Sequence, residues 1–251
     1  MNGNRNTVSC SAYLSRLGRL CALAVAGLFA ATATADPYLT FSSAQSFTIT
    51  PLEVSWNGRI QYSTNATSWS SFTSAGATAA DDGSGTYKLH FRGTNNTVIT
   101  GYYKPGWRLT AAGTVACEGN IETLLDYTAV AAGQHPPMGG YCFINLFENW
   151  TALTNAPALP AMEPAGFGYY GMFRGCTGLA QAPALPATNL FTYCYGFMFQ
   201  GCTGIKLKTA GPGAPWSIPS GATGAMGWNN SMFANTGGAF TGNPAIGTVY
   251  Y

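Results

Sequence analysis

Alternation of apolar and polar residues dominates the chain from position 36 to about 115. The alternating runs are short, and Gly-containing turns such as Asn57-Gly58 and Asp82-Gly83 separate them. Short alternating runs of this kind predict β-strands packed on one face. The expected strands are 38–41, 47–50, 59–63, 87–92 and 97–100, with one or two more between 107 and 117. This pattern predicts a small antiparallel β-sandwich-like domain over 36–112.

The second half of the chain repeats with a period of 26 residues. Tyr141 recurs as Phe167 and Tyr193, and Ala156-Pro157 recurs as Ala182-Pro183. Self-similarity at one period between 20 and 50 residues is typical of a solenoid, in which each coil packs on its neighbours. We therefore predict a short solenoid over 113–251, with atypical coils as caps at both ends. The expected fold class is mainly β.

Each repeat is expected to contain two local elements. The aromatic segment that ends in Met-Phe predicts a short helix or tight turn, and the following Leu-x-x-Ala-Pro segment predicts a very short parallel strand, because proline cannot donate to a ladder. One period upstream, Glu118–Tyr127 predicts a short helix with Asn120 as its N-cap. That helix would belong to the N-terminal cap.

The repeated columns are expected to form the buried interior. The core columns are Phe147, Phe173, Phe199, Leu153, Leu179, Ile205, Cys176 and Cys202. The other aromatic columns, such as Tyr141, Phe167 and Tyr193, are assigned to the interior as well. Ligand contacts should then lie where the chain does not repeat. The candidates are Asn155, Gln181, Lys206, Lys208 and Trp228; the two lysines are also explained as a charged edge that prevents further coils from adding.

The first 35 residues have the pattern of a secretory signal peptide. Arg5, Arg16 and Arg19 precede an apolar run that is too short to span a membrane, and Ala33-Thr34-Ala35 forms a cleavage site. Removal of residues 1–35 leaves eight basic and nine acidic residues, a net charge of −1. That charge argues against nucleic acid as a partner. No later stretch of the sequence is apolar enough for a transmembrane segment.

Five cysteines remain after position 35, an odd number that leaves at least one unpaired. Cys176 and Cys202 are one period apart. They are either buried thiols or a disulfide between adjacent coils, and the reach of a disulfide, ~4.4–6.8 Å between Cα atoms, favours the thiols. Both alternatives are compatible with an exported protein.

Catalytic and metal-binding motifs do not occur in the sequence. His90 and His135 are the histidines, and neither stands next to an acid or nucleophile motif. Asp81-Asp82-Gly-Ser-Gly85 lacks the ligand spacing and closing glutamate of a calcium loop, so a hairpin turn is expected there. We therefore expect a non-enzyme without cofactor or metal.

The repeat resembles the BspA-like leucine-rich-repeat proteins of bacterial surfaces. The likeness rests on Met198-Phe-Gln-Gly-Cys-Thr203 and on Ala182-Pro-Ala-Leu-Pro-Ala-Thr188, and it covers about residues 115–251. The resemblance implies a curved solenoid, secreted or displayed on the cell surface, in a group associated with adhesion. It supplies no catalytic residue, and the sequence shows no C-terminal wall anchor of a recognisable kind.

Together these features predict an exported bacterial protein that presents a solenoid surface to an extracellular protein or glycan. Two alternatives remain at this stage. One is a secreted carbohydrate-binding accessory module, which would require two of Trp56, Trp69, Trp107, Trp216 and Trp228 to be exposed side by side. The other is a purely structural envelope protein.

Overall fold

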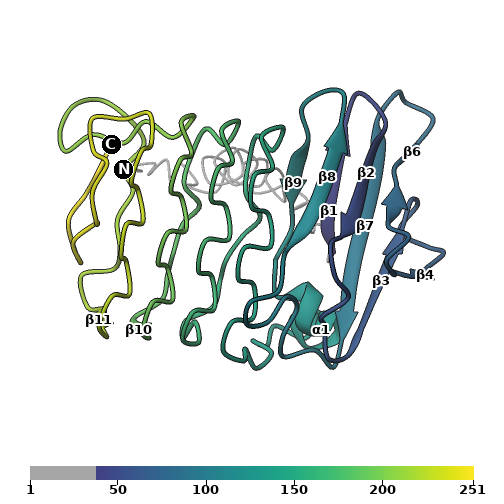
Figure 1. The fold of residues 1–251 in the computed structure, drawn as a ribbon, viewed down its shortest axis with the longest axis horizontal. Helices are drawn as coiled ribbons and strands as arrows, with labels where there is room; N and C mark the ends of the chain where they lie inside the picture. The colour runs from purple at the N-terminus through teal and green to yellow at the C-terminus, as the bar shows by residue number, and fades with distance from the viewer. Residues whose placement is uncertain (1–37) are drawn as a thin grey trace, which may run out of the picture. The chain divides into compact units, whose positions relative to one another are not determined.

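The computed structural model describes residues 38–251, so the predicted signal peptide lies outside the described residues. The described residues belong to one compact unit. The described chain is mainly β, with two antiparallel sheets followed by stacked coils, and Figure 1 shows the coils side by side beyond the sheets. The prediction of a mainly β protein with antiparallel sheets is confirmed.

The larger sheet has six strands in the order β4-β3-β7-β1-β9, with β6 also paired to β7. Its pairings are antiparallel, and Phe41 lies opposite Leu89 in the β1–β7 register. The strands are β1 (Leu39–Ser43), β3 (Arg59–Ser63), β4 (Ser70–Ser71), β6 (Ala80–Asp81), β7 (Tyr87–Thr94) and β9 (Ala116–Glu118).

The smaller sheet has three antiparallel strands in the order β5-β2-β8, namely β5 (Ala77–Thr78), β2 (Phe47–Pro51) and β8 (Trp107–Ala111). Alternate residues of β2 are buried, as its alternating sequence predicts. The buried aromatic rings join the two sheets. The ring centroid of Trp107 in β8 lies 5.4 Å from that of Phe91 in β7 and 4.9 Å from that of Phe72. Each such ring pair stabilises the fold by ~0.5–1.5 kcal/mol beyond the contribution of its buried area.

One predicted strand, 97–100, is not a strand in the structure. Its backbone N–H groups are used elsewhere: those of Thr97 and Val98 donate to the Asn57 side chain, and those of Ile99 and Thr100 donate to the carbonyl of Cys142. The segment therefore joins the sheets to the first coil instead of extending a sheet.

The helix α1 (Thr123–Ala131) begins later than the predicted 118–127 and is interrupted at Asp126, whose φ is −152°. The interruption has a local cause, because the Asp126 carboxylate accepts hydrogen bonds from the N–H groups of Thr128 and Ala129. It thus caps a second helical turn. Asn120 accepts a hydrogen bond from the N–H of Glu122, next to the helix start.

The coils are joined by backbone hydrogen bonds from every second residue of one coil to the next. Tyr141, Phe143 and Phe147 donate to the carbonyls of Gly166, Gly168 and Met172, and the same pattern recurs one period later. Within each coil, the aromatic segment forms tight turns, the second of the two expected alternatives. A residue with positive φ recurs there every four positions: Tyr141, Asn145, Asn149; Phe167, Gly171, Gly175; Tyr193, Phe197, Gly201.

The parallel strands predicted at Leu-x-x-Ala-Pro are not shown. In the described residues, the parallel pairing is restricted to β10 (Asn189–Leu190) with β11 (Thr223–Gly224) and to single bridges such as Val115 with Leu153. Pro157 and Pro183 have no N–H to donate, which prevents a longer ladder at these positions. The turns of the aromatic segment carry the hydrogen bonds between coils instead.

Candidate functional site

One aromatic column lies at the surface of the coils rather than in the interior. Tyr141, Phe167 and Tyr193 are half-buried, and their rings stack with centroid distances of 4.8 and 5.1 Å and interplanar angles of 17° and 16°. Two positions further along each coil, the column of Phe143, Tyr169 and Tyr195 is fully buried. The expectation that both columns are interior is therefore wrong for the first of them.

The stacked column continues onto the loop before β8. Tyr102 lies 4.6 Å from Tyr141, and Tyr103 lies 3.9 Å from Tyr102, both measured between ring centroids. These two tyrosines are 55% and 83% exposed. Because the loop belongs to the part of the chain that does not repeat, the sheets and the coils build this surface together.

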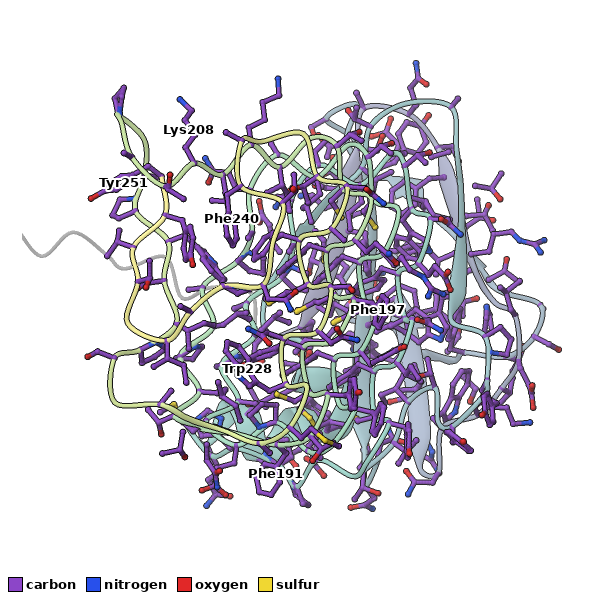
Figure 2. All side chains as sticks on the ribbon, turned by 60° about the vertical axis from the view of Figure 1, so that its left-hand side comes forward. Phe191, Phe197, Lys208, Trp228, Phe240 and Tyr251 are labelled. Atoms are coloured by element: carbon purple, nitrogen blue, oxygen red, sulfur yellow. The ribbon has the colours of Figure 1, made fainter. Side chains whose placement is uncertain are left out.

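Tyr170 and Phe197 broaden the column in its middle. Tyr170 contacts Phe167 at 5.6 Å and Phe197 at 5.2 Å, and both side chains are half-buried. Figure 2 labels Phe197, together with Trp228 of the last coil. We call the following set the aromatic ladder: Tyr102, Tyr103, Tyr141, Phe167, Tyr170, Tyr193 and Phe197.

The backbone under the ladder is strained. Tyr103, Tyr141, Phe167, Tyr193 and Phe197 all have φ between 53° and 61°. A left-handed conformation costs an L-residue about 1–2 kcal/mol, and glycine would avoid that cost. Strained residues of this kind cluster at functional sites. The presence of large aromatic rings at positions where glycine would cost less free energy therefore motivates a functional hypothesis.

Gly227 ends the ladder at the last coil. It occupies the position equivalent to Tyr193, has a φ of 67°, and a side chain there would come within 2.7 Å of the Tyr193 ring. The ring of Tyr193 therefore lies directly over backbone, and the stack has a defined end.

The ladder is electrically neutral. A hydrogen bond with Tyr103 raises the pKa of Tyr102, and burial raises the pKa of Tyr170, so these phenols stay protonated at neutral pH. The adjacent charges are paired: Lys104 with Glu53, and Arg174 with Glu148 at 2.8 Å. The surface thus offers apolar ring edges together with hydroxyl groups that both donate and accept hydrogen bonds.

Of the five residues predicted to face a ligand, one is held by hydrogen bonds within the protein, one is buried and three are exposed. Asn155 is occupied structurally, because its amide donates to the carbonyl of Cys117 and accepts from the N–H of the same residue. Trp228 is only 9% exposed and packs against Tyr195, with ring centroids 6.4 Å apart. Neither of these two residues is free to contact a ligand through its side chain.

Gln181, Lys206 and Lys208 are exposed. Gln181 and Lys206 line one shallow cleft of about 210 Å³ together with Trp216 and Tyr251. Lys208 is fixed through its backbone, which exchanges two hydrogen bonds with Tyr251 at 2.8 and 2.9 Å. Of the five residues predicted to face a ligand, the structure therefore places two, Gln181 and Lys206, in the same cleft.

The predicted core columns are all buried. Their exposure does not exceed 1%, and the rings of Phe147, Phe173 and Phe199 follow one another at 5.6 and 5.7 Å. The thiol of Cys176 donates to the carbonyl of Phe147, and that of Cys202 donates to the carbonyl of Phe173, both at 3.0 Å. The described cysteines are free thiols. Cys176 and Cys202 are therefore buried thiols in the structure and do not form a disulfide between adjacent coils.

The buried thiols and phenols lead us to expect that the folded protein loses stability at alkaline pH. Burial raises the pKa of Cys194 and Cys202 to about 12 and that of Tyr169 and Tyr195 well above the usual range. The unfolded chain loses these protons first, from about pH 8.5 for cysteine. Stability should therefore be constant from pH 7 to 8 and fall steadily above about pH 8.5. Thermal unfolding in reducing buffers checks this, and an unchanged midpoint at pH 10 would contradict it.

The histidines have partners that the sequence does not show. His90 contacts Thr40 at 2.9 Å inside the larger sheet, and His135 contacts the carboxylate of Glu122 at 2.8 Å. Glu122 is 13 residues away from His135 in the sequence, so the fold brings this acid to the histidine and no local motif marks the pair. The described part of the chain contains no cluster of three or more metal-ligating side chains.

The Asp81–Gly85 loop is a turn held by its own hydrogen bonds. The Asp81 carboxylate accepts from the N–H groups of Gly83 and Gly85, and Asp82 pairs with Lys88 at 2.8 Å. These oxygens are used locally, which agrees with the hairpin interpretation.

The tryptophans considered for carbohydrate binding are all buried or half-buried. Trp69 lies half-buried against the guanidinium of Arg92, 4.0 Å from its ring centroid, and Trp56 stacks on Phe72. The side-by-side exposure that a tryptophan platform requires is therefore not present in residues 38–251.

Comparison with known proteins finds no matching family model, no matching curated protein and no matching solved structure. Within residues 38–251, no helix has the length and apolar character needed to cross a membrane.

Proposed function

We propose that this is an exported, non-enzymatic binding protein that engages a protein partner through the aromatic ladder. In this proposal the region 113–251 is a short leucine-rich-repeat-like solenoid related to the BspA-like surface proteins, and the sandwich-like domain 36–112 supports its first coil. The protein acts outside the cell or at the cell surface, in adhesion. The observation that carries the proposal is a continuous row of surface aromatic rings held on left-handed backbone.

The chemistry of the ladder suits a protein interface. Tyrosine is enriched at protein interfaces because one end of its ring is apolar and the other forms hydrogen bonds. The stacked rings also have few rotamers left to lose on binding, which lowers the entropic cost of association. A neutral surface in a chain with only 8% charged residues further favours a partner recognised by packing rather than by charge.

The orientation of the rings favours a protein over a glycan. Sugars stack on exposed ring faces, but Tyr141, Phe167 and Tyr193 cover one another's faces at angles of 16–17°. Their edges and hydroxyl groups are what remains at the surface. Only the end of the stack, at Tyr103, leaves a ring largely uncovered.

Binding measurements on a panel of immobilised extracellular-matrix proteins would test this function. The double variant Tyr102→Ser/Tyr103→Ser removes the two most exposed rings, and we expect at least about a tenfold loss of affinity for any protein that binds. The matched control Phe191→Ser/Val249→Ser removes exposed apolar side chains outside the ladder and should bind as the natural protein does.

Two outcomes would contradict the proposal. Equal binding by the ladder variant and the control would show that the ladder is not the interface. Binding that disappears when the glycans of the matrix proteins are removed enzymatically would identify a glycan ligand instead. Circular dichroism of both variants verifies that the fold is retained.

A further inference from the structure

The last coil of the stack carries a row of backbone N–H groups that its own chain does not use. In the coils that begin at Tyr141, Phe167 and Tyr193, alternate residues donate their N–H groups to carbonyls of the next coil at 2.7–3.1 Å. Within residues 38–251, the N–H groups at the equivalent positions of the last coil have no hydrogen-bond partner. We call these four residues the donor row: Asn229, Ser231, Phe233 and Asn235.

This end of the stack offers hydrogen-bond donors and lacks free acceptors. From Trp228 to Ala234 every backbone carbonyl already accepts a hydrogen bond, either from the preceding coil or from a turn within the last coil. The sequence from 164 to 251 contains neither aspartate nor glutamate, so this part of the chain supplies no side-chain carboxylate as an acceptor. Figure 2 turns this end of the stack toward the viewer, with Trp228 labelled on the last coil. A binding partner must therefore bring acceptors.

One of the four donors is buried. Phe233 is fully buried, and its ring centroid lies 6.0 Å from that of Phe240. A buried N–H group without a partner is rare in folded proteins, because it has given up water without gaining another hydrogen bond. Asn229 and Ser231 are half-buried and Asn235 is exposed, so the row lies at the surface. The unsatisfied donor indicates that binding completes this end of the stack.

A second copy of the chain does not supply the missing acceptors. At the other end of the stack, the carbonyls of Tyr141, Cys142 and Leu146 already accept N–H groups from the segment 99–107. Head-to-tail stacking of two copies is therefore closed. Two copies placed together through their last coils would set donors against donors. The complementary carbonyls must come from a different polypeptide.

We propose that the last coil binds a segment of a partner protein in the place of a further coil, with main-chain carbonyls of that segment on the donor row. Main-chain hydrogen bonds supply the affinity, as they do when a strand is added to a sheet edge. The row runs over tight turns, with φ of 51° at Ser231 and 59° at Asn235, so an extended strand does not follow it. A matching segment repeats these turns and needs residues that tolerate positive φ every four positions, as Gly171 and Gly175 do in their own coil.

The partner is therefore a protein with glycine or asparagine at four-residue spacing. No residue of the donor row belongs to the aromatic ladder, so this proposal stands whether or not the ladder is an interface.

NMR titration with a synthetic peptide tests the proposal. The probe has the sequence of residues 164–178 with Cys176→Ser and both ends blocked, because carbonyls of this segment accept the N–H groups of the preceding coil. We expect binding at peptide concentrations below about 1 mM, and hydrogen exchange of the Ser231 and Asn235 amides slowed at least about tenfold. The control peptide carries Gly171→Val and Gly175→Val, which keep the carbonyls and disfavour positive φ. It should bind at least about tenfold less tightly.

Variants locate the site on the protein. Ser231→Glu, and Asn235→Glu at the exposed end of the row, place a carboxylate over the donors and should each weaken binding of the probe at least about tenfold. Ser217→Glu adds the same side chain at an exposed position before the last coil and should bind as the natural protein does. Circular dichroism of the three variants verifies that the fold is retained.

Four outcomes would overturn the proposal. They are the absence of binding up to about 1 mM peptide, binding that leaves hydrogen exchange of the donor row unchanged, equal affinity for the valine peptide, and equal binding by the Ser231→Glu and Ser217→Glu variants. Self-association of the natural protein that Ser231→Glu abolishes would identify a second copy as the occupant and would also contradict a different partner.

Discussion

Replacement of Gly93 by alanine is expected to destabilise the protein by more than about 4 kcal/mol, a loss that few single substitutions reach. Gly93 lies in β7, and a Cβ atom there would stand 1.6 Å from the carbonyl oxygen of Leu124. The same carbonyl accepts a hydrogen bond from Asn96 at 2.9 Å. The obstacle is backbone at the start of α1, so a change of side-chain rotamer does not relieve it.

Urea unfolding of Gly93→Ala against Gly221→Ala measures this effect. No atom beyond its chain neighbours lies within 4 Å of a Cβ at Gly221, so alanine there should change stability by no more than about 0.5 kcal/mol. Similar midpoints for the two variants would show that β7 and α1 are not in contact as described.

The second large effect is expected at Phe173. Its ring is fully buried between Phe147 at 5.6 Å and Phe199 at 5.7 Å, in the middle of the stacked coils. Truncation to alanine leaves a cavity that both neighbouring coils border. We expect a loss of ~3–5 kcal/mol in the free energy of unfolding.

Phe173→Leu is the matched variant, since it keeps most of the apolar volume and should cost clearly less. Thermal and urea unfolding of both variants check that Phe173→Leu is the more stable of the two. If Phe173→Ala unfolded like the natural protein, the column would not be core, and the register of the coils would be incorrect.

Several elements follow from local sequence alone. The alternating residues of 47–50 and 59–63 become β2 and β3, because a strand with one buried face repeats every two residues. One or two further strands were expected between 107 and 117, and the structure has two there, β8 and β9. In β2 the pattern that predicts the strand is also the pattern of its burial, whereas in β3 the buried residues are Ile60 and Ser63.

Other elements depended on partners distant in sequence. The strand expected at 97–100 was lost because Asn57 and Cys142 accept its N–H groups. The helix expected at 118–127 shifted because Asp126 caps a new turn through its own carboxylate. Side-chain hydrogen bonds of this kind compete with regular structure, and alternation of apolar residues carries no information about them.

The candidate sites were the least predictable part. Tyr141 and Phe143 belong to equally regular columns, yet one lies at the surface and the other in the core. The signal that distinguishes them is the glycine at Gly227, which marks a left-handed position in the column of Tyr141. Glu122 and His135 carry no such signal, because the turn after α1 brings them together.

By itself, the sequence determined the period of the coils, the residues of the core columns and the antiparallel character of the sheets that precede the coils. These properties follow from hydrophobic periodicity, which burial enforces along the whole chain. Only the tertiary structure decided which face of a coil each aromatic column occupies and which polar groups meet across the clefts. The reason is that a left-handed residue every four positions turns successive side chains inward and outward, and that direction is set by backbone conformation and packing rather than by residue type.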